Sequence, residues 1–314
     1  MKKRPASMNK RPASSPGSSS LKKSNTVTWE QAAAAELPPG KSLGIDHAVL
    51  GVIRLDWHYH PMPGDVGSPS SFEFPVVYRA VPGLTFEVCQ SGQLTPEIEA
   101  EFIKAIQWLD RIKGVSVISA DCGFFMWFQK LARRHTSKPV VMSSLAILPA
   151  INCAIHGKVG IFTANSESLA PMHDCVKDEC GVEWNESRYV LVGCQDVPGF
   201  EAVAHGTEVD FQKVMPGVVG KAKQVLADHP DISAFLFECT QLPPFSDDVR
   251  AATGLPVYDA ITCCDSVMMG FVDNPRFGLN TWHKSFDGER EQYKLGDCLG
   301  PEGKRRLVNL PANG

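Results

Sequence analysis

The sequence lacks an apolar run long enough to cross a bilayer. The best candidate, residues 140–155, is interrupted by Ser143, Ser144, Pro149 and Asn152. A surplus of basic charge is also missing, because 31 Lys and Arg face 35 Asp and Glu, whereas a nucleic-acid-binding domain normally presents a strongly basic face. We therefore expect a soluble intracellular protein whose partners are small molecules or copies of itself, with neither nucleic acid nor a membrane among them.

Sequence signals for cofactors and metals are missing as well. No Gly-x-Gly-x-x-Gly follows a predicted strand, and there is no phosphate-binding loop. The ten cysteines are too few and too irregularly spaced for a disulfide framework, so we expect most of them to be buried free thiols. His58 and His60 have no matched third ligand, and His173, Cys175 and Cys180 lack the paired spacing of a zinc site. We expect no cofactor and no metal.

The first forty residues differ from the rest of the chain. They are rich in Ser, Pro, Lys and Arg, contain no acidic residue before Glu30, and repeat Lys-Arg-Pro-Ala-Ser at 3–7 and 10–14. Such a segment cannot bury enough apolar surface to offset the entropy lost on ordering. We expect residues 1–43 to be a disordered tail. An organellar transit peptide is the alternative, which leaves the cytoplasm and the plastid open as locations.

From about residue 44, short β-branched runs alternate with helical stretches, a pattern typical of an α/β protein with mainly parallel sheets. Apolar periodicity predicts helices at 96–112 and 209–229. The predicted strands lie at 48–55, 115–120, 140–143, 159–163, 189–192 and 233–237.

A new strand and loop begin near residue 157, which indicates a boundary near residue 155. The late apolar stretch 259–271 is expected to cross back onto the first half. We therefore predict two similar lobes with a cleft between them. The first comprises 44–155 plus 259–314, and the second comprises 156–258.

Two cysteines follow predicted strands at equivalent places, Cys122 after 115–120 and Cys239 after 233–237. Ligands bind at this edge of open α/β sheets, and a helix that begins there is expected to lower a thiol pKa from about 8.5. Two thiols facing each other can remove or supply a proton at a carbon next to a carboxylate without a cofactor. The spacing therefore predicts an active site in the cleft, with Cys122 and Cys239 as its catalytic pair.

The segments 118–123 and 237–243 resemble the two cysteine motifs of the aspartate/glutamate racemase superfamily. The pair Cys239-Thr240 is the sharper match, and the order of strands is similar over roughly residues 44–275. Amino-acid racemases usually follow the first cysteine with Asn-Thr, which helps to hold the substrate amino group, whereas Gly123-Phe124 follows Cys122 here. The resemblance thus favours a substrate other than an amino acid.

The segments 51–56, 61–69 and 78–87 resemble the algal dimethylsulfoniopropionate lyases of the Alma type, which belong to that superfamily. The resemblance implies cleavage of dimethylsulfoniopropionate to dimethyl sulfide and acrylate by a homotetramer in which both cysteines are essential. Abstraction of the proton next to the carboxylate lets neutral dimethyl sulfide depart. Either thiol can serve as the base, while the other donates a hydrogen bond to the carboxylate as charge develops.

Candidate substrate-binding residues lie near the predicted strand ends. Trp57 and Tyr59 offer aromatic faces to a sulfonium, each contributing about 0.5 to 2 kcal/mol, and ordinary packing is the alternative. Hydroxyl groups that could meet the carboxylate come from Ser143, Ser144, Thr163 and Thr240. For these four residues the alternative is simple helix capping.

Two other function classes fit the same residues. A cofactor-independent racemase or epimerase needs an acid/base group on each face of the carbon, so both cysteines should matter equally, and a decarboxylase of a small carboxylic acid would also form an enediolate. A non-catalytic carboxylate-binding protein would retain the cleft without chemistry. The presence of both cysteines and Thr240 argues against that last reading.

Overall fold

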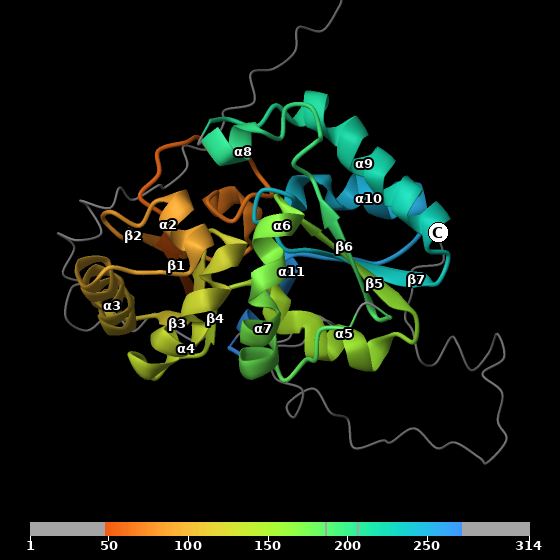
Figure 1. The fold of residues 1–314 in the computed structure, drawn as a ribbon. Coiled ribbons are helices and arrows are strands. Elements are labelled where there is room, and N and C mark those ends of the chain that lie inside the picture. The colour runs from red at the N-terminus through yellow and green to blue at the C-terminus, as the bar shows by residue number, and fades with distance from the viewer. Residues whose placement is uncertain (1–47, 186, 206, 272–314) are drawn as a thin grey trace, which may run out of the picture. The chain divides into compact units, whose positions relative to one another are not determined.

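The computed structural model describes residues 48–271, apart from residues 186 and 206 (Figure 1). The predicted tail at 1–43 lies outside the described residues, and so do residues 272–314 of the predicted first lobe. The division of the chain into lobes with those bounds therefore stays a prediction. In the part that is described, no helix is long and apolar enough to cross a membrane.

The described chain forms two four-stranded sheets, and every strand pair in them is parallel. The first sheet has the order β2-β1-β3-β4, with β1 at Val49–Arg54, β2 at Val76–Ala80, β3 at Val115–Ala120 and β4 at Val140–Val141. The second has the order β6-β5-β7-β8, with β5 at Lys158–Thr163, β6 at Tyr189–Gly193, β7 at Ile232–Phe237 and β8 at Val257–Tyr258. The predicted α/β class with parallel sheets is confirmed.

Helices connect the strands, as parallel pairing requires. The α-helices of the described residues are α2 (Phe86–Ser91), α3 (Pro96–Arg111), α4 (Gln129–Arg134), α5 (Leu148–Ala154), α6 (Ser166–Leu169), α7 (His173–Cys180), α8 (Ala202–His205), α9 (Phe211–Asp228), α10 (Ser246–Thr253) and α11 (Ala260–Met268). Short 3-10 turns are η2 (Pro69–Ser71), η3 (Gly123–Phe128), η4 (Ser144–Ile147), η5 (Ala170–Met172) and η6 (Pro243–Phe245).

The two helices predicted from periodicity are confirmed within two residues at each end. In α3, the Thr95 hydroxyl accepts a hydrogen bond from the Ile98 N–H, and the buried face carries Phe102, Ile106 and Leu109. In α9, the Asp210 carboxylate accepts hydrogen bonds from two first-turn N–H groups. Each helix therefore begins at a side-chain cap and is held by its apolar stripe.

Strands β2 and β8 were not predicted, although the other six coincide with predicted segments. Every residue of β2 is partly or fully exposed, so the strand lacks the continuous apolar run that marks a buried parallel strand. Strand β8 has only two residues, too few for any periodicity. The predicted strand at 140–143 is also shorter in the structure, ending at Val141.

The apolar core runs from one sheet to the other. One face of the second sheet, with Ile161 and Leu236, belongs to the same buried cluster as Ile118 and Phe125 of the first half. The opposite face packs with α9 in a second cluster. Figure 1 shows α9 and α10 on one side of the second sheet and α5 on the other.

Helix α11 returns the chain to the first sheet after β8. It contacts β3 and η4. The Cys264 thiol donates to the Ser119 hydroxyl at 3.3 Å, and the Cys263 thiol lies 3.9 Å from the Ser143 carbonyl oxygen. These adjacent cysteines are buried packing residues, as expected from their place in a late apolar helix.

Candidate active site

The two candidate cysteines follow equivalent strands at the same distance. Cys122 comes two residues after β3 and Cys239 two residues after β7, at the carboxyl ends of strands that occupy the same place in their sheets. Both are buried, with 6% and 8% of their surface exposed. The sequence thus located both thiols correctly at the sheet edges where ligands bind in α/β proteins.

Two hydroxyl groups tie the cysteine segments together across the two halves. The Thr240 hydroxyl, next to Cys239, donates to the carbonyl oxygen of Asp121 at 2.5 Å. The Ser144 hydroxyl donates to the carbonyl oxygen of Phe237 at 2.8 Å. Each half therefore supplies a hydroxyl to the main chain that precedes the other half's cysteine, and this brings both thiols into one site.

The predicted lowering of the thiol pKa values is wrong for this structure. A hydrogen bond that the Cys122 thiol donates to Cys89, together with burial, raises the pKa of Cys122 well above its usual value, and burial with the nearby Glu238 does the same for Cys239. The N–H groups of Phe124 and Gln241 act in the expected direction but are outweighed. The reason is burial, which disfavours a charged thiolate and outweighs the N–H groups at these strand ends.

The four predicted hydroxyl residues gather at the strand ends and are all buried. Three of them donate to protein acceptors: Ser144 to Phe237, Thr240 to Asp121, and Thr163 to Glu238 Oε2 at 2.7 Å. The fourth, Ser143, caps η4 by accepting from the Leu145 N–H. The four hydroxyl groups thus make hydrogen bonds to protein atoms around the cysteines. Their role in binding the substrate carboxylate stays a prediction.

The two predicted aromatic residues, Trp57 and Tyr59, belong to a chain of rings that ends at Phe124, two residues after Cys122. The rings of Trp57 and Tyr59 lie 4.7 Å apart, and Phe86 lies 6.1 Å from Trp57 on one side and 6.1 Å from Phe124 on the other. Phe124 itself is a buried core residue. Trp57 packs against both apolar clusters, and its buried indole N–H has no hydrogen-bond partner among the described residues. Trp57 is thus adjacent to both halves of the site.

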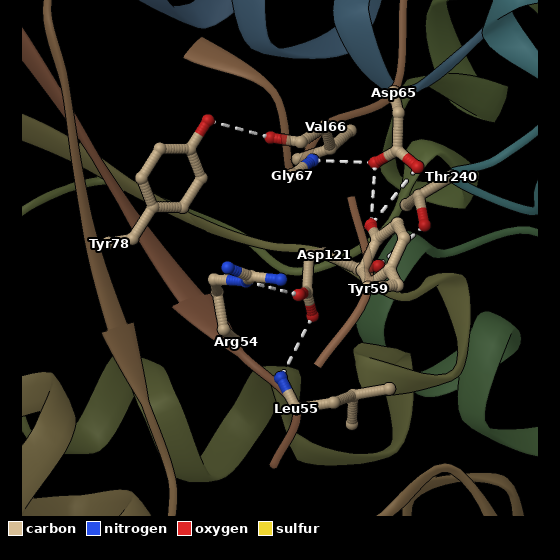
Figure 2. Close-up of polar contacts among 9 residues, drawn as sticks. All are labelled: Arg54, Leu55, Tyr59, Asp65, Val66, Gly67, Tyr78, Asp121 and Thr240. Carbon is tan, nitrogen blue, oxygen red and sulfur yellow. Dashed lines mark hydrogen bonds and ion pairs between the residues drawn. The ribbon is translucent and has the colours of Figure 1, made fainter. Parts of the chain in front are cut away.

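A charged network that the sequence did not predict includes Asp121, the residue before Cys122 (Figure 2). Asp121 accepts hydrogen bonds from Arg54 Nε at 3.1 Å and from the Leu55 N–H at 3.0 Å. The guanidinium of Arg54 also lies over the rings of Tyr59 and Tyr78, at 5.6 and 5.8 Å. Burial raises the pKa of Asp121 to about 6, against the opposing effect of Arg54.

A second buried acid, Asp65, belongs to the same network. Its carboxylate accepts from the Tyr59 hydroxyl at 2.9 and 3.0 Å and from the Gly67 N–H at 2.6 Å (Figure 2). Burial raises its pKa to about 7. Asp65 lies in the segment 61–69 and Asp121 in the segment 118–123, both of which resemble family motifs. Residue spacing alone does not tell whether a carboxyl group is buried or solvated.

A small cavity of about 20 Å³ lies next to this network, large enough for a water molecule. It is lined by Tyr59, His60, Pro61, Met62, Asp65, Val209, Gln241 and Pro244. At the surface, His60 Nδ1 lies 2.7 Å from Glu208 Oε1, and both side chains are exposed. Neither cysteine lines this cavity, and both thiols are almost fully buried.

Histidines and cysteines outside the thiol pair form no metal site in the part of the chain that the structure describes. Among residues 48–271, apart from 186 and 206, no three His, Cys, Asp or Glu side chains gather in a way that could hold a metal ion. His60 meets Glu208, and His173 stacks on Trp184 with ring centroids 4.0 Å apart.

Comparison with known proteins identifies the family. No protein-family model matches the chain. A dimethylsulfoniopropionate lyase from Durusdinium sp. clade D is 70% identical over 274 residues, which make up 87% of this chain and 90% of that protein. The chain belongs to the dimethylsulfoniopropionate lyase family. Lyases 3 and 7 of Emiliania huxleyi (strain CCMP1516) are 54% and 55% identical over 87% of the chain, covering 74% and 83% of those proteins.

Solved structures of lower similarity align with this member of the dimethylsulfoniopropionate lyase family. Allantoin racemase from Pseudomonas fluorescens is 11% identical with a TM-score of 0.48, over 79% of this chain and 100% of its own. An aspartate racemase homologue from Pyrococcus horikoshii OT3 is 14% identical with a TM-score of 0.46, over 71% and 97%. The α/β class of the lyase family member rests on its own two parallel sheets.

The dimethylsulfoniopropionate lyase family member therefore brings together most of the residues predicted for its site. Thr240 and Ser144 donate hydrogen bonds to the main chain just before Cys122 and Cys239, while Trp57 packs against both apolar clusters. The sequence did not predict that three acidic residues near the site, Asp65, Asp121 and Glu238, would be buried.

Proposed function

We propose that the chain cleaves dimethylsulfoniopropionate to dimethyl sulfide and acrylate. The observation that carries the proposal is the pair of buried thiols at equivalent strand ends, joined by reciprocal hydroxyl contacts into one site. A protein 70% identical to this chain is a dimethylsulfoniopropionate lyase, which supports the choice of substrate. Two thiols in one site are suited to moving a proton at a carbon next to a carboxylate.

The chemistry is a β-elimination that needs one base. A thiolate of Cys122 or Cys239 takes the proton from the carbon next to the carboxylate, and the electrons of that C–H bond form the new C=C bond. The bond between carbon and sulfur breaks, and its electron pair leaves with dimethyl sulfide. The second thiol donates a hydrogen bond to the carboxylate, whose negative charge grows in the transition state. One proton is released in each turnover.

The substrate's own charge helps to form the thiolate. Because burial raises the pKa of both thiols, the free site holds them protonated. A bound sulfonium is an opposite charge next to a thiol, which favours the ionised sulfur. The Trp57–Tyr59 stack is the proposed sulfonium subsite, because aromatic faces attract such cations.

The carboxylate end falls to the hydroxyl residues Ser143, Ser144, Thr163 and Thr240. Three of these donate to protein acceptors in this form. To meet a carboxylate, each of those three must exchange its present bond for one to the substrate. Ser143 accepts a hydrogen bond from Leu145, so its own proton remains available for donation to the substrate.

We also infer the coarser organisation of the protein from the resemblance and the sequence pattern. The resemblance supports self-association into a homotetramer, which light scattering on the purified full chain would measure. The acid-poor, Ser-rich start supports a tail ahead of two lobes, with the cytoplasm or the plastid as its location.

Headspace detection of dimethyl sulfide tests the proposal. Purified, reduced protein receives dimethylsulfoniopropionate beside the variants Cys122→Ala and Cys239→Ala, with Cys153→Ala as the matched control because Cys153 is exposed on α5. The parent and the control should release gas, and each site variant should lose about 100-fold or more. A folded, reduced parent that releases none overturns the lyase assignment and favours the racemase or decarboxylase reading.

A further inference from the structure

A fully buried carboxyl group lies between the two cysteine segments. Glu238 follows β7 and directly precedes Cys239, and none of its surface is exposed. Its main-chain N–H donates to the Phe162 carbonyl oxygen at 2.7 Å, which fixes the residue to β5. Its Oε2 accepts from the Thr163 hydroxyl at 2.7 Å, whereas Oε1 has no hydrogen-bond partner in the described structure.

The unpartnered oxygen lies against the main chain next to the other cysteine. A Cβ atom added at Gly123 would stand 1.9 Å from Glu238 Oε1 and 2.4 Å from the Glu238 carbonyl oxygen. The absence of a side chain at Gly123 therefore makes room for the carboxyl group. Because Gly123 follows Cys122 and Glu238 precedes Cys239, one carboxyl group lies between both cysteine segments, and its charge helps to raise the pKa of both thiols.

A purely structural role does not account for this residue. A buried acid with an unsatisfied oxygen and no cation beside it lowers stability. A glutamine of the same shape would accept the Thr163 hydrogen bond without the cost of burying an ionisable group. Buried ionisable groups with perturbed pKa values gather at functional sites, so the neighbouring thiols give the carboxyl group a reason to be there.

The proposed elimination leaves a proton that must go elsewhere. The thiol that takes the proton from the substrate becomes neutral and is buried, so it must lose that proton before the next turnover. Burial raises the pKa of Glu238 to about 7, and the Thr163 hydrogen bond opposes that rise. Near neutral pH the group therefore exists both as carboxylate and as carboxylic acid, which is what a proton carrier requires.

Few charged or titratable groups of the described chain interact with the Glu238 carboxyl group. The thiols whose pKa it raises are those of Cys89, Cys122 and Cys239. Burial and the Thr163 hydroxyl are the influences on its own pKa, and no lysine, arginine or histidine of the described chain is among them. The charge of the carboxyl group therefore acts on these three thiols.

We propose that Glu238 is the internal proton acceptor of the site, taking the proton from the thiol that has removed it from the substrate. In this step the S–H bond breaks with its electron pair left on sulfur, and an O–H bond forms at Oε1. The resulting carboxylic acid then releases the proton to water. The inference rests on the proposed lyase function, and Glu238 acts through the thiols without touching the substrate.

The variant Glu238→Gln tests the proposal, because glutamine keeps the shape and the Thr163 contact but cannot take up a proton. We expect kcat for dimethyl sulfide release to fall about 100-fold or more. We also expect the rise of kcat with pH near 7 to disappear. If Glu238 only repelled negative charge on the thiols, its removal would ease thiolate formation, and a kcat that is retained or increased would overturn the inference.

A second variant, Thr163→Val, keeps the test decisive if glutamine disturbs folding. It removes the hydrogen bond that lowers the pKa of Glu238, so the rise of activity should move to higher pH. If activity rises at the same pH in Thr163→Val as in the parent, another group controls the rise and the inference is overturned. Turnover by the parent protein tests the lyase function separately, because a failed parent releases no gas, whereas a failed inference leaves an active parent and an active Glu238→Gln variant.

Discussion

Single hydroxyl groups hold the active-site main chain in this protein. Thr240 is buried, and its hydroxyl donates to the carbonyl oxygen of Asp121 at 2.5 Å, next to Cys122. Replacing it with valine leaves that carbonyl without a partner in the protein interior. We expect Thr240→Val to lower the free energy of unfolding by about 1–3 kcal/mol, measured by urea denaturation.

The matched control for this prediction is Thr240→Ser, which keeps the donor. The serine variant should unfold near the parent midpoint, and its release of dimethyl sulfide should exceed that of the valine variant. Equal stability of the valine and serine variants would contradict the role given to the hydroxyl.

At this scale the sequence predicted the residues whose place follows from chain position. Cys122 and Cys239 directly follow strands, so their position at the sheet edge could be inferred without side-chain geometry. Glu238 and Asp65 were missed, because whether a carboxyl group is buried depends on residues far away in the chain. The thiol pKa was wrong for the same reason, since burial comes from packing that no local pattern reveals.

Among the elements, helix α9 offers two glycines with opposite surroundings. A Cβ added at Gly220 meets nothing within 4 Å, whereas one added at Gly217 would stand 2.5 Å from Val197 Cγ1. We expect Gly220→Ala to raise the free energy of unfolding by about 0.5–1 kcal/mol, because alanine favours the helix. Thermal denaturation of both variants measures the difference.

The companion variant Gly217→Ala should have the opposite sign. Its methyl group must displace Val197, a buried residue, so the melting temperature should fall below that of the parent. A melting temperature above that of the parent in both variants would show that Val197 moves aside at little energetic cost.

Apolar periodicity was sufficient to predict a helix where its apolar stripe is long. Helix α9 was predicted to within two residues at each end although it contains Pro216, because the apolar stripe continues on both sides of that residue. Strand β2 was missed because it lies at the edge of its sheet and half exposed, where burial leaves no continuous apolar run.

At the scale of the whole molecule, stability depends on pH through three buried acids of the described residues whose pKa values are raised. Burial raises the pKa of Glu238 and Asp65 to about 7 and that of Asp121 to about 6. Between roughly pH 4 and 7 the unfolded chain has lost these protons while the folded chain retains them, so the unfolded state binds fewer protons. The free energy of unfolding should therefore fall as pH rises through this window.

In the variant Glu238→Gln, the free energy of unfolding should fall less steeply as pH rises. A pKa raised from 4.5 to about 7 corresponds to about 3 kcal/mol of stability lost between the two values. Urea denaturation of parent and variant from pH 4 to pH 8 measures this, with the exposed Glu99→Gln as the matched control. An unchanged slope in Glu238→Gln would mean that the carboxyl group is ionised in the folded protein.

The arrangement of the whole chain was predictable only in part. The alternation of strands and helices recurs after residue 157, which indicated two similar sheets. The continuous core between them was not predictable, because periodicity tells which face of an element is apolar but not which surface covers it. The pairing of Ser144 with Phe237 is likewise a product of that packing.

The matched topology of the two halves has a historical meaning. Both sheets have the same strand order, both have a register shift at the start of the central strand, β1 or β5, and both place a cysteine two residues after the third strand. A chain built this way has the form that fusion of two copies of a half-length ancestor would produce. Each copy of such an ancestor would have carried one thiol, and only by pairing with its twin would it have completed a site.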